Sequence, residues 1–152
     1  MNTLTCDAIA DFFIGFAQKH GDYLTNLKLQ KLVYYAQAWN LALYDKPLFD
    51  DDFQAWIHGP VCPKLYSKFK QYRWNPITEK PSDVTIPNDI KEHLIEIFDI
   101  YGKFSGYQLE QMTHAETPWI GARGNTPLDE ASTAVIPKKA MKTFYSKLAS
   151  EE

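Results

Sequence analysis

Hydrophobic residues cover most of the circumference of the helix that the segment from Leu24 to Tyr44 predicts. At about 100° per residue, most of the polar positions of this segment fall on one narrow stripe. A helix that is apolar over most of its surface is usually buried at the centre of a domain. Thr25 is a suitable N-cap, and Asp45 and Pro47 follow the expected end near Tyr44. The stripe consists of Asn26, Gln30, Val33, Gln37 and Asn40.

Amphipathic patterns predict further helices on both sides of this central helix. A two-residue alternation from Phe49 to Ile57 predicts a short strand or an extended arm, after which Gly59 and Pro60 turn the chain. The proline-rich segment from Trp74 to Asn88 predicts a loop with a brief strand at 84–86. Two of the remaining predicted helices have a cap: the helix at 7–19 is capped by Thr5, and the helix at 88–100 is capped by Asn88. Further helices are predicted to start at Pro63, to span 108–115 and to start at Thr117. A strand at 133–136 and a final helix that includes Met141 and Leu148 complete the prediction.

These elements predict a mainly α fold with a minor β component. We expect a compact helical domain around the buried central helix, with a small antiparallel sheet or extended arm. The 152 residues fit a single domain, residues 1–152, because a chain of this length can bury a sizeable core.

Charge and hydropathy narrow the partners that the chain can have. The net charge of −3 and the presence of only two arginines, Arg73 and Arg123, disfavour nucleic acid as a partner. No apolar run reaches the roughly 18 uncharged residues of a membrane span, and the N-terminus does not resemble a signal peptide. We therefore expect a cytoplasmic protein that does not use a membrane.

Candidate residues for catalysis or metal binding do not form a recognisable set. Cys6 and Cys62 are too few and too far apart in sequence for a disulfide scaffold or a zinc site, so free thiols are expected. The acidic run at 50–52 is not an EF-hand and is better explained as a solvated turn. Cys62 lies near His58, but no sequence feature identifies an activated thiolate or an oxyanion site. We expect no enzyme activity, no cofactor and no metal.

Three blocks of sequence, taken in order, resemble the Panacea domain, the SocA-like antitoxin family that also includes phage-associated proteins of the GepA type. The blocks are LTNLKLQKLVYYAQAWNLAL from Leu24, FDDDFQAWIHGPV from Phe49 and LEQMTHAETPW, which ends at Trp119. The positions that carry the resemblance are Leu29, Gln30, Lys31, Leu32, Tyr34, Tyr35, Trp39, Ala55, Trp56, Gly59, Pro60, Val61, Thr113, His114, Pro118 and Trp119.

The resemblance implies a protein that neutralises a toxin, encoded nearby, by binding it. Within the family a second mechanism occurs, in which the antitoxin is a proteolytic adaptor that delivers its toxin to an ATP-dependent protease. A third hypothesis is a DNA-binding autoregulator of its own operon. It would use a basic face formed by Lys64, Lys68 and Arg73, or the C-terminal lysines.

The motif residues have a structural and a functional interpretation, and the sequence leaves both open. Gly59 permits a close approach or a positive φ, Pro60 fixes the next φ, and the Trp56 indole can pin this corner to the central helix. His114 is expected to tie one helix to the next by a hydrogen bond. In the functional interpretation, exposed aromatic and basic side chains near the corner bind the toxin. The predicted anchors are Lys28, Lys31, Tyr35, Trp56 and Tyr66.

Overall fold

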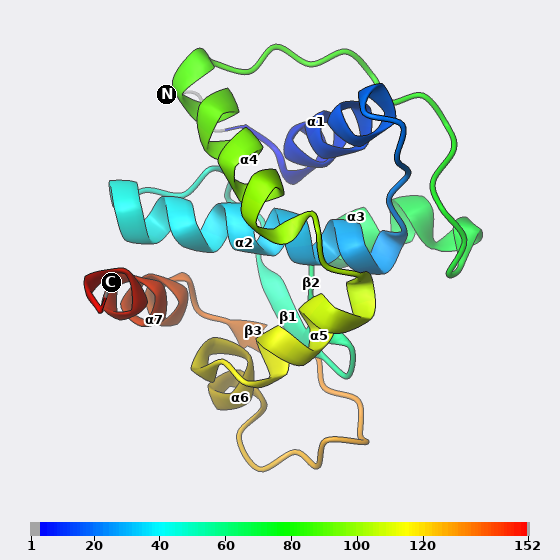
Figure 1. Ribbon diagram of the computed structural model, residues 1–152. Helices are drawn as coiled ribbons and strands as arrows, with labels where there is room; N and C mark the ends of the chain where they lie inside the picture. The colour runs from blue at the N-terminus through cyan, green and yellow to red at the C-terminus, as the bar shows by residue number, and fades with distance from the viewer. Residues whose placement is uncertain (1–3, 152) are drawn as a thin grey trace.

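The structure is a computed structural model that describes residues 4–151, and its architecture is mainly helical, as the sequence predicts (Figure 1). One long helix, α2 (Asn26–Tyr44), runs through the middle of the molecule. Helices α1 (Cys6–Lys19) and α4 (Asn88–Tyr101) lie on one side of it. On the other side lie α5 (Gly106–His114), α6 (Thr117–Arg123) and α7 (Lys138–Ser150). Near the N-terminal end of α2 lies α3 (Pro63–Phe69), which continues into a 3-10 turn, η1 (Lys70–Tyr72).

The central helix is buried on nearly all sides, which confirms the sequence prediction. Thr25 caps it by accepting a hydrogen bond from the Lys28 backbone N–H. Its polar stripe does not face water, because four of the stripe's side chains hydrogen bond to the backbone of the segment that returns along the helix. Buried amides need such partners, so the stripe fixes the path of that segment. The contacts run from Asn26 to Tyr66, from Gln30 to Cys62, from Gln37 to Leu48 and Phe49, and from Asn40 to Lys46.

A small antiparallel sheet of order β2-β1-β3 packs against α2. It consists of β1 (Phe53–Trp56), β2 (Gly59–Val61) and β3 (Val135–Ile136), and the expected alternation buries Phe53 and Ala55. The sequence prediction that Gly59 and Pro60 turn the chain is wrong, because both belong to β2 and pair with Trp56 and Ala55. The turn lies two residues earlier, at 57–58. Pro60 can occupy this strand because β2 is at the edge of the sheet.

Two further local predictions differ from the structure. Residues 84–86 form no strand, because the chain there is held by burial of Ile86 against the core and not by strand pairing. Asn88 is the first residue of α4 and does not cap it, since Pro87 holds the N-cap position with an extended backbone. The other helices agree with the predicted ranges to within one or two residues.

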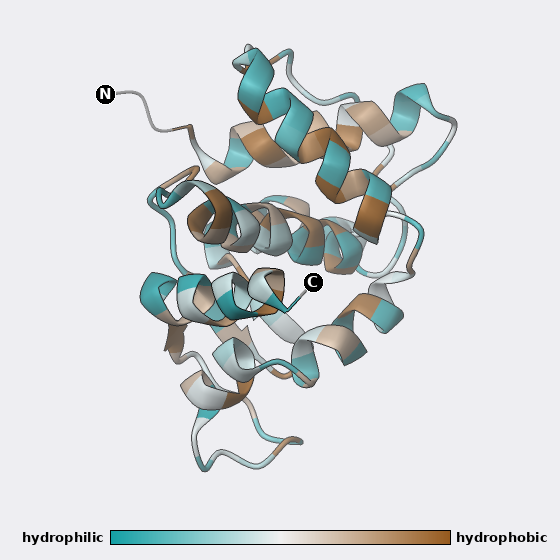
Figure 2. Ribbon diagram, turned by 60° about the vertical axis from the view of Figure 1, so that its left-hand side comes forward, coloured by the Kyte–Doolittle hydropathy of each residue, from teal (hydrophilic) through white to brown (hydrophobic). Residues whose placement is uncertain are grey.

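Hydropathy follows this arrangement. The outer helices alternate hydrophilic and hydrophobic residues, which is the pattern of a helix with one face on a core (Figure 2). Within residues 4–151, no helix combines the length and the hydrophobicity needed to cross a membrane.

Candidate functional site

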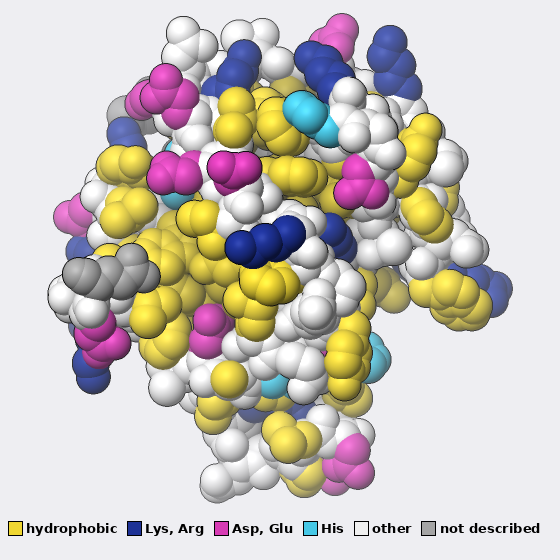
Figure 3. All heavy atoms as spheres, in the orientation of Figure 1, with side chains coloured by type: hydrophobic (Ala, Val, Ile, Leu, Met, Phe, Trp, Pro, Cys, Tyr) yellow, Lys and Arg dark blue, Asp and Glu magenta, His cyan; other side chains and the backbone are white. Residues whose placement is uncertain are grey.

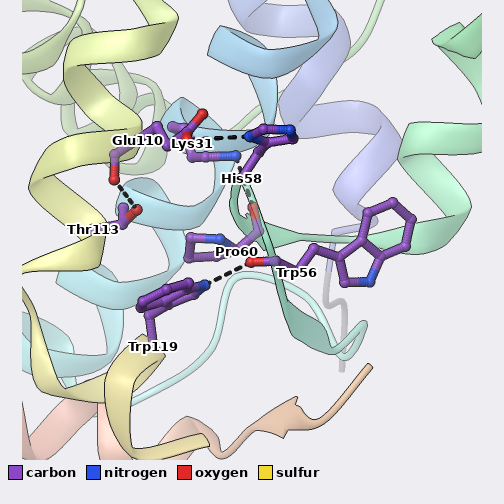
Figure 4. A network of polar contacts seen from close by, with 7 residues as sticks. All are labelled: Lys31, Trp56, His58, Pro60, Glu110, Thr113 and Trp119. Atoms are coloured by element: carbon purple, nitrogen blue, oxygen red, sulfur yellow. Dashed lines mark hydrogen bonds and ion pairs between the residues drawn. The ribbon is translucent and has the colours of Figure 1, made fainter. Parts of the chain in front are cut away.

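The three sequence blocks meet around the side chain of Lys31, on the side of α2 that faces β2 and α5 (Figure 4). Lys31 is completely buried, and its Nζ donates a hydrogen bond to the Pro60 carbonyl oxygen at 3.3 Å. Burial lowers the pKa of Lys31 to about 7, and the charge of Glu110 opposes part of this shift. Lys31 therefore fixes the hairpin of β1 and β2 to the central helix.

Gly59 makes this close packing possible because it has no side chain. Its φ is +107°, and a Cβ added there would lie 2.5 Å from the Lys31 Cε and 2.9 Å from the Thr113 Oγ1. Thr113 is itself fixed, since its hydroxyl donates to the Glu110 carbonyl at 2.8 Å. The glycine of the second block is thus packed between the lysine of the first block and the threonine of the third.

A short path of polar groups joins this buried lysine to the surface. His58, in the hairpin turn, lies with its Nδ1 3.1 Å from the Glu110 Oε2. The His58 side chain is 71% exposed, whereas that of Glu110 is 11% exposed. Sequence reasoning included neither residue in the site, because a histidine in a turn and a glutamate on an amphipathic helix carry no motif of their own.

Trp119 holds β1, the other strand of the hairpin. Its Nε1 donates to the Trp56 carbonyl at 2.8 Å, and the His114 ring stacks on the indole with 3.9 Å between ring centroids. His114 therefore ties α5 to α6 as expected, but the tie is ring stacking, and its Nε2 is buried without a hydrogen-bond partner among residues 4–151. Burial lowers the pKa of His114, so its neutral form is favoured in this position.

Arg123 is a second part of the site that the sequence did not reveal. Its guanidinium donates to the carbonyls of Ala55, Pro127 and Glu130, and it lies 4.9 Å from the Trp119 ring. Only 4% of Arg123 is exposed, so it serves the interior. The sequence contains one signal for Arg123, which is that the chain has just two arginines.

The five predicted partner-binding residues fall into two groups. Trp56 is half-buried and Tyr66 is exposed, and the two rings pack edge to face with centroids 5.1 Å apart. Lys28 is half-buried, and its Nζ donates to the Gly102 carbonyl at 2.6 Å. The expectation that Lys31 and Tyr35 are exposed is wrong, since both are 0% exposed.

The physical reason is that α2 is covered on this side as well. The Tyr35 ring stacks on the Tyr101 ring of α4, with ring centroids 4.0 Å apart. The Tyr35 hydroxyl donates to the Glu116 carboxylate at 3.0 Å. Tyr145 of α7 donates to the same carboxylate oxygen at 2.7 Å. Burial raises the pKa of Glu116, while the two tyrosine hydroxyls oppose the shift.

The chemistry that this site supports is recognition by shape and fixed hydrogen bonds. A lysine with a lowered pKa can be a nucleophile, but the burial of Lys31 keeps its amine from any substrate. A groove of about 640 Å³ lies elsewhere, along α7, and no motif residue lines it. Cys62 lies beside Cys6 and Asp51 in a cluster that contains no histidine, as far as the described residues show.

Comparison with known proteins identifies the family of this chain. Residues 29–120 match the family described as antitoxin SocA-like, Panacea domain, a range that includes every motif position from Leu29 to Trp119. The chain therefore belongs to the SocA-like Panacea family. It is 30% identical over 129 residues to the antitoxin SocA of Caulobacter vibrioides (strain NA1000 / CB15N), and the alignment spans 74% of this chain but only 66% of that relative. No solved structure gives a significant match.

Proposed function

We propose that this protein is an antitoxin that neutralises a cognate toxin, encoded nearby, by binding it directly. Family membership is the observation that carries the proposal. The buried positions of Lys31, Gly59, Thr113 and Trp119 support a division of roles, in which these motif residues build a rigid scaffold. The residues that touch the toxin are then the exposed ones that this scaffold holds in place.

The surface that fits this role best is the hairpin end, which we define as Trp56, His58 and Tyr66. Each of its three members is held by a contact to the scaffold. The Trp56 carbonyl accepts from Trp119, the Tyr66 carbonyl accepts from Asn26, and the His58 imidazole meets Glu110. The Trp56 indole also donates to the Gln54 Oε1 and packs edge to face on the Tyr66 ring, so both aromatic side chains are held in place. Aromatic side chains that are already fixed lose little conformational entropy on binding, which is why tryptophan and tyrosine dominate interface hot spots.

Co-expression tests this surface. The neighbouring open reading frame is expressed alone, to show toxicity, and then with wild-type antitoxin, with the double variant Trp56→Ala/Tyr66→Ala, or with Trp74→Ala. Trp74 is a matched control, because it is 77% exposed and lies outside the hairpin end. The double variant should lose rescue and co-purification, with a fall in affinity of about thirtyfold or more, while Trp74→Ala keeps both. Equal rescue by all three proteins would exclude the hairpin end as the binding surface.

A cell-free assay separates direct inhibition from proteolytic delivery. Purified toxin is assayed with purified antitoxin, with and without an ATP-dependent protease and ATP. Direct neutralisation predicts full recovery of the toxin's target without protease. Recovery that requires protease would replace our proposal with the adaptor mechanism, and a neighbouring protein that is harmless alone would remove the support for an antitoxin.

The structure gives little support to the alternative of a DNA-binding autoregulator. The Lys64 and Lys68 ammonium groups each lie 3.9 Å from a carboxylate of α1, that of Asp7 and that of Asp11. On the face shown in Figure 3, basic and acidic side chains are interspersed. A gel shift at the upstream promoter that weakens steeply with salt would be needed to revive this function.

A further inference from the structure

Two cysteines that are far apart in sequence meet in the interior, next to an acidic residue. Cys6 is the first residue of α1, Cys62 directly precedes α3, and their sulfur atoms lie 3.5 Å apart. Both are free thiols, with 0% and 2% exposure. A carboxylate oxygen of Asp51 lies within 4.8 Å of both sulfur atoms. The two cysteines are expected to lie apart because they are far apart in sequence, but the fold brings them together.

The spacing of the sulfur atoms fits a shared ion better than a bond between them. Two thiolates bound to one tetrahedral ion, each at about 2.3 Å, have sulfur atoms about 3.8 Å apart. The observed 3.5 Å differs from this by only a few tenths of an ångström. A disulfide would require the sulfur atoms to approach to about 2.05 Å, and this would move two buried side chains that are held at the starts of two helices.

The charges in this corner also favour a cation. Asp7, next to Cys6, has one carboxylate oxygen buried without a hydrogen-bond partner among the described residues. Its other oxygen lies 3.9 Å from the Nζ of Lys64, whose side chain is 62% exposed. Buried carboxylate oxygens cost free energy when they are not compensated, and a divalent ion close by would offset that cost.

We propose that Cys6, Cys62 and Asp51 form a binding site for a soft divalent metal ion of the zinc class, with a water molecule as the fourth ligand. Two sulfur ligands and one oxygen ligand suit zinc and disfavour magnesium and calcium, which require oxygen ligands. Asp51 is only partly buried, so this ligand is in contact with solvent. Binding displaces one proton from each thiol to solvent, and no oxidant or reductant takes part.

An ion bound at this site would join α1 to the start of α3. The two cysteines are 56 residues apart, so a metal that binds only the folded chain closes a long loop and stabilises the fold. The acidic run at 50–52, predicted from the sequence to be a solvated turn, contributes Asp51 to the site.

Cobalt(II) is the probe that tests this proposal. The full chain is reduced, stripped with a chelator and titrated with cobalt, and the absorbance of the thiolate-to-cobalt transition is followed. Wild type should take up one equivalent with this absorbance, and stoichiometric zinc should displace the cobalt and slow the reaction of both thiols with a disulfide reagent. Asp51→Asn should bind cobalt at least tenfold more weakly, and Cys62→Ala should abolish the thiolate absorbance.

Asp50→Asn is the matched control, since Asp50 is an exposed carboxylate next to Asp51. It should bind cobalt as wild type does. Folding of each variant is checked by circular dichroism, and Asp51→Asn keeps the test valid if a cysteine variant does not fold. Wild type without thiolate absorbance, or Asp51→Asn with unchanged affinity, would overturn the site. The formation of a Cys6 to Cys62 disulfide with oxidised glutathione, at the same rate with and without zinc, would also overturn it.

Discussion

Gly59 lies so close to Lys31 that a Cβ on the glycine would come within 2.5 Å of the lysine Cε. The lysine is unable to move aside, because its side chain is completely buried and its amine is bonded to the Pro60 carbonyl. Two motif residues from different blocks thus depend on each other through packing alone. This relationship explains why a lysine in a helix and a glycine in an edge strand belong to one site.

Replacing Gly59 with alanine should destabilise the protein more than the same change at Gly21. Both glycines have a positive φ, so both substitutions cost about 1–3 kcal/mol in backbone strain. At Gly21 no atom lies within 4 Å of the new Cβ, whereas at Gly59 the new methyl meets Lys31 and Thr113. We expect Gly59→Ala to cost about 1–3 kcal/mol more than Gly21→Ala, measured by urea denaturation. Equal costs would show that the hairpin can move away from α2.

The lowered pKa of Lys31 should appear in the pH dependence of stability. The pKa is about 7 in the native state, against about 10.4 in an unfolded chain. Between these values the unfolded state holds a proton that the native state lacks, so the free energy of unfolding rises with pH. Lys31→Met removes this contribution. The stability of the variant relative to wild type should therefore fall by about 1.4 kcal/mol per pH unit above pH 7.

This comparison is made by urea denaturation with a reducing agent present, from about pH 6 to about pH 9, below the range in which tyrosines ionise in the unfolded chain. Lys70→Met is the control, because Lys70 is exposed and its curve should run parallel to that of wild type. Parallel curves for Lys31→Met and wild type would mean that Lys31 binds its proton equally well in the native and the unfolded state.

The hydrophobic periodicity and the capping residues within individual helices and strands were enough to predict most of the fold. The position of α2, its Thr25 cap and the burial of Phe53 and Ala55 in β1 depend on local periodicity and capping, which a sequence shows directly. The turn was placed wrongly because Gly59 and Pro60 are typical turn residues. In this protein they are selected by packing on Lys31 and by an edge-strand position, and both depend on the tertiary structure.

The site was less predictable, because charge and exposure are not properties of a single segment. Lys31 and Tyr35 are both buried by tertiary packing. Pro60 and Gly59 of β2 pack on Lys31, and Tyr101 of α4 and Tyr145 of α7 pack on Tyr35. The contact of His58 with Glu110 joins residues that are 52 positions apart. The roles of Arg123 and Glu116 likewise depend on contacts between distant elements, which no spacing rule describes.

Glu116 and the tyrosines that bind it should behave as one energetic unit. Tyr145→Phe removes a donor that lies 2.7 Å from the buried carboxylate, and we expect a loss of about 1–3 kcal/mol in the free energy of unfolding. In a Glu116→Gln background the acceptor carries no charge, so the same change should cost less. A double-mutant cycle at pH 7 measures this coupling, which we expect to be at least about 0.5 kcal/mol. Additive effects would mean that the hydroxyl acts mainly through Tyr34, 3.4 Å away.

Arg123 should determine the order of residues 124–134, which connect α6 to the sheet largely without regular structure. Its planar guanidinium reaches the Ala55 carbonyl in β1 and two carbonyls of this connection at once, and a lysine ammonium does not have that geometry. Arg123→Lys should therefore lower the free energy of unfolding by about 1–3 kcal/mol and speed proteolytic cleavage within 124–134. The control is Arg73→Lys, at an exposed site, which should leave cleavage there unchanged. If Arg123→Lys is cleaved no faster than wild type under native conditions, the connection is held by its own contacts, and the arginine serves only to cover Trp119.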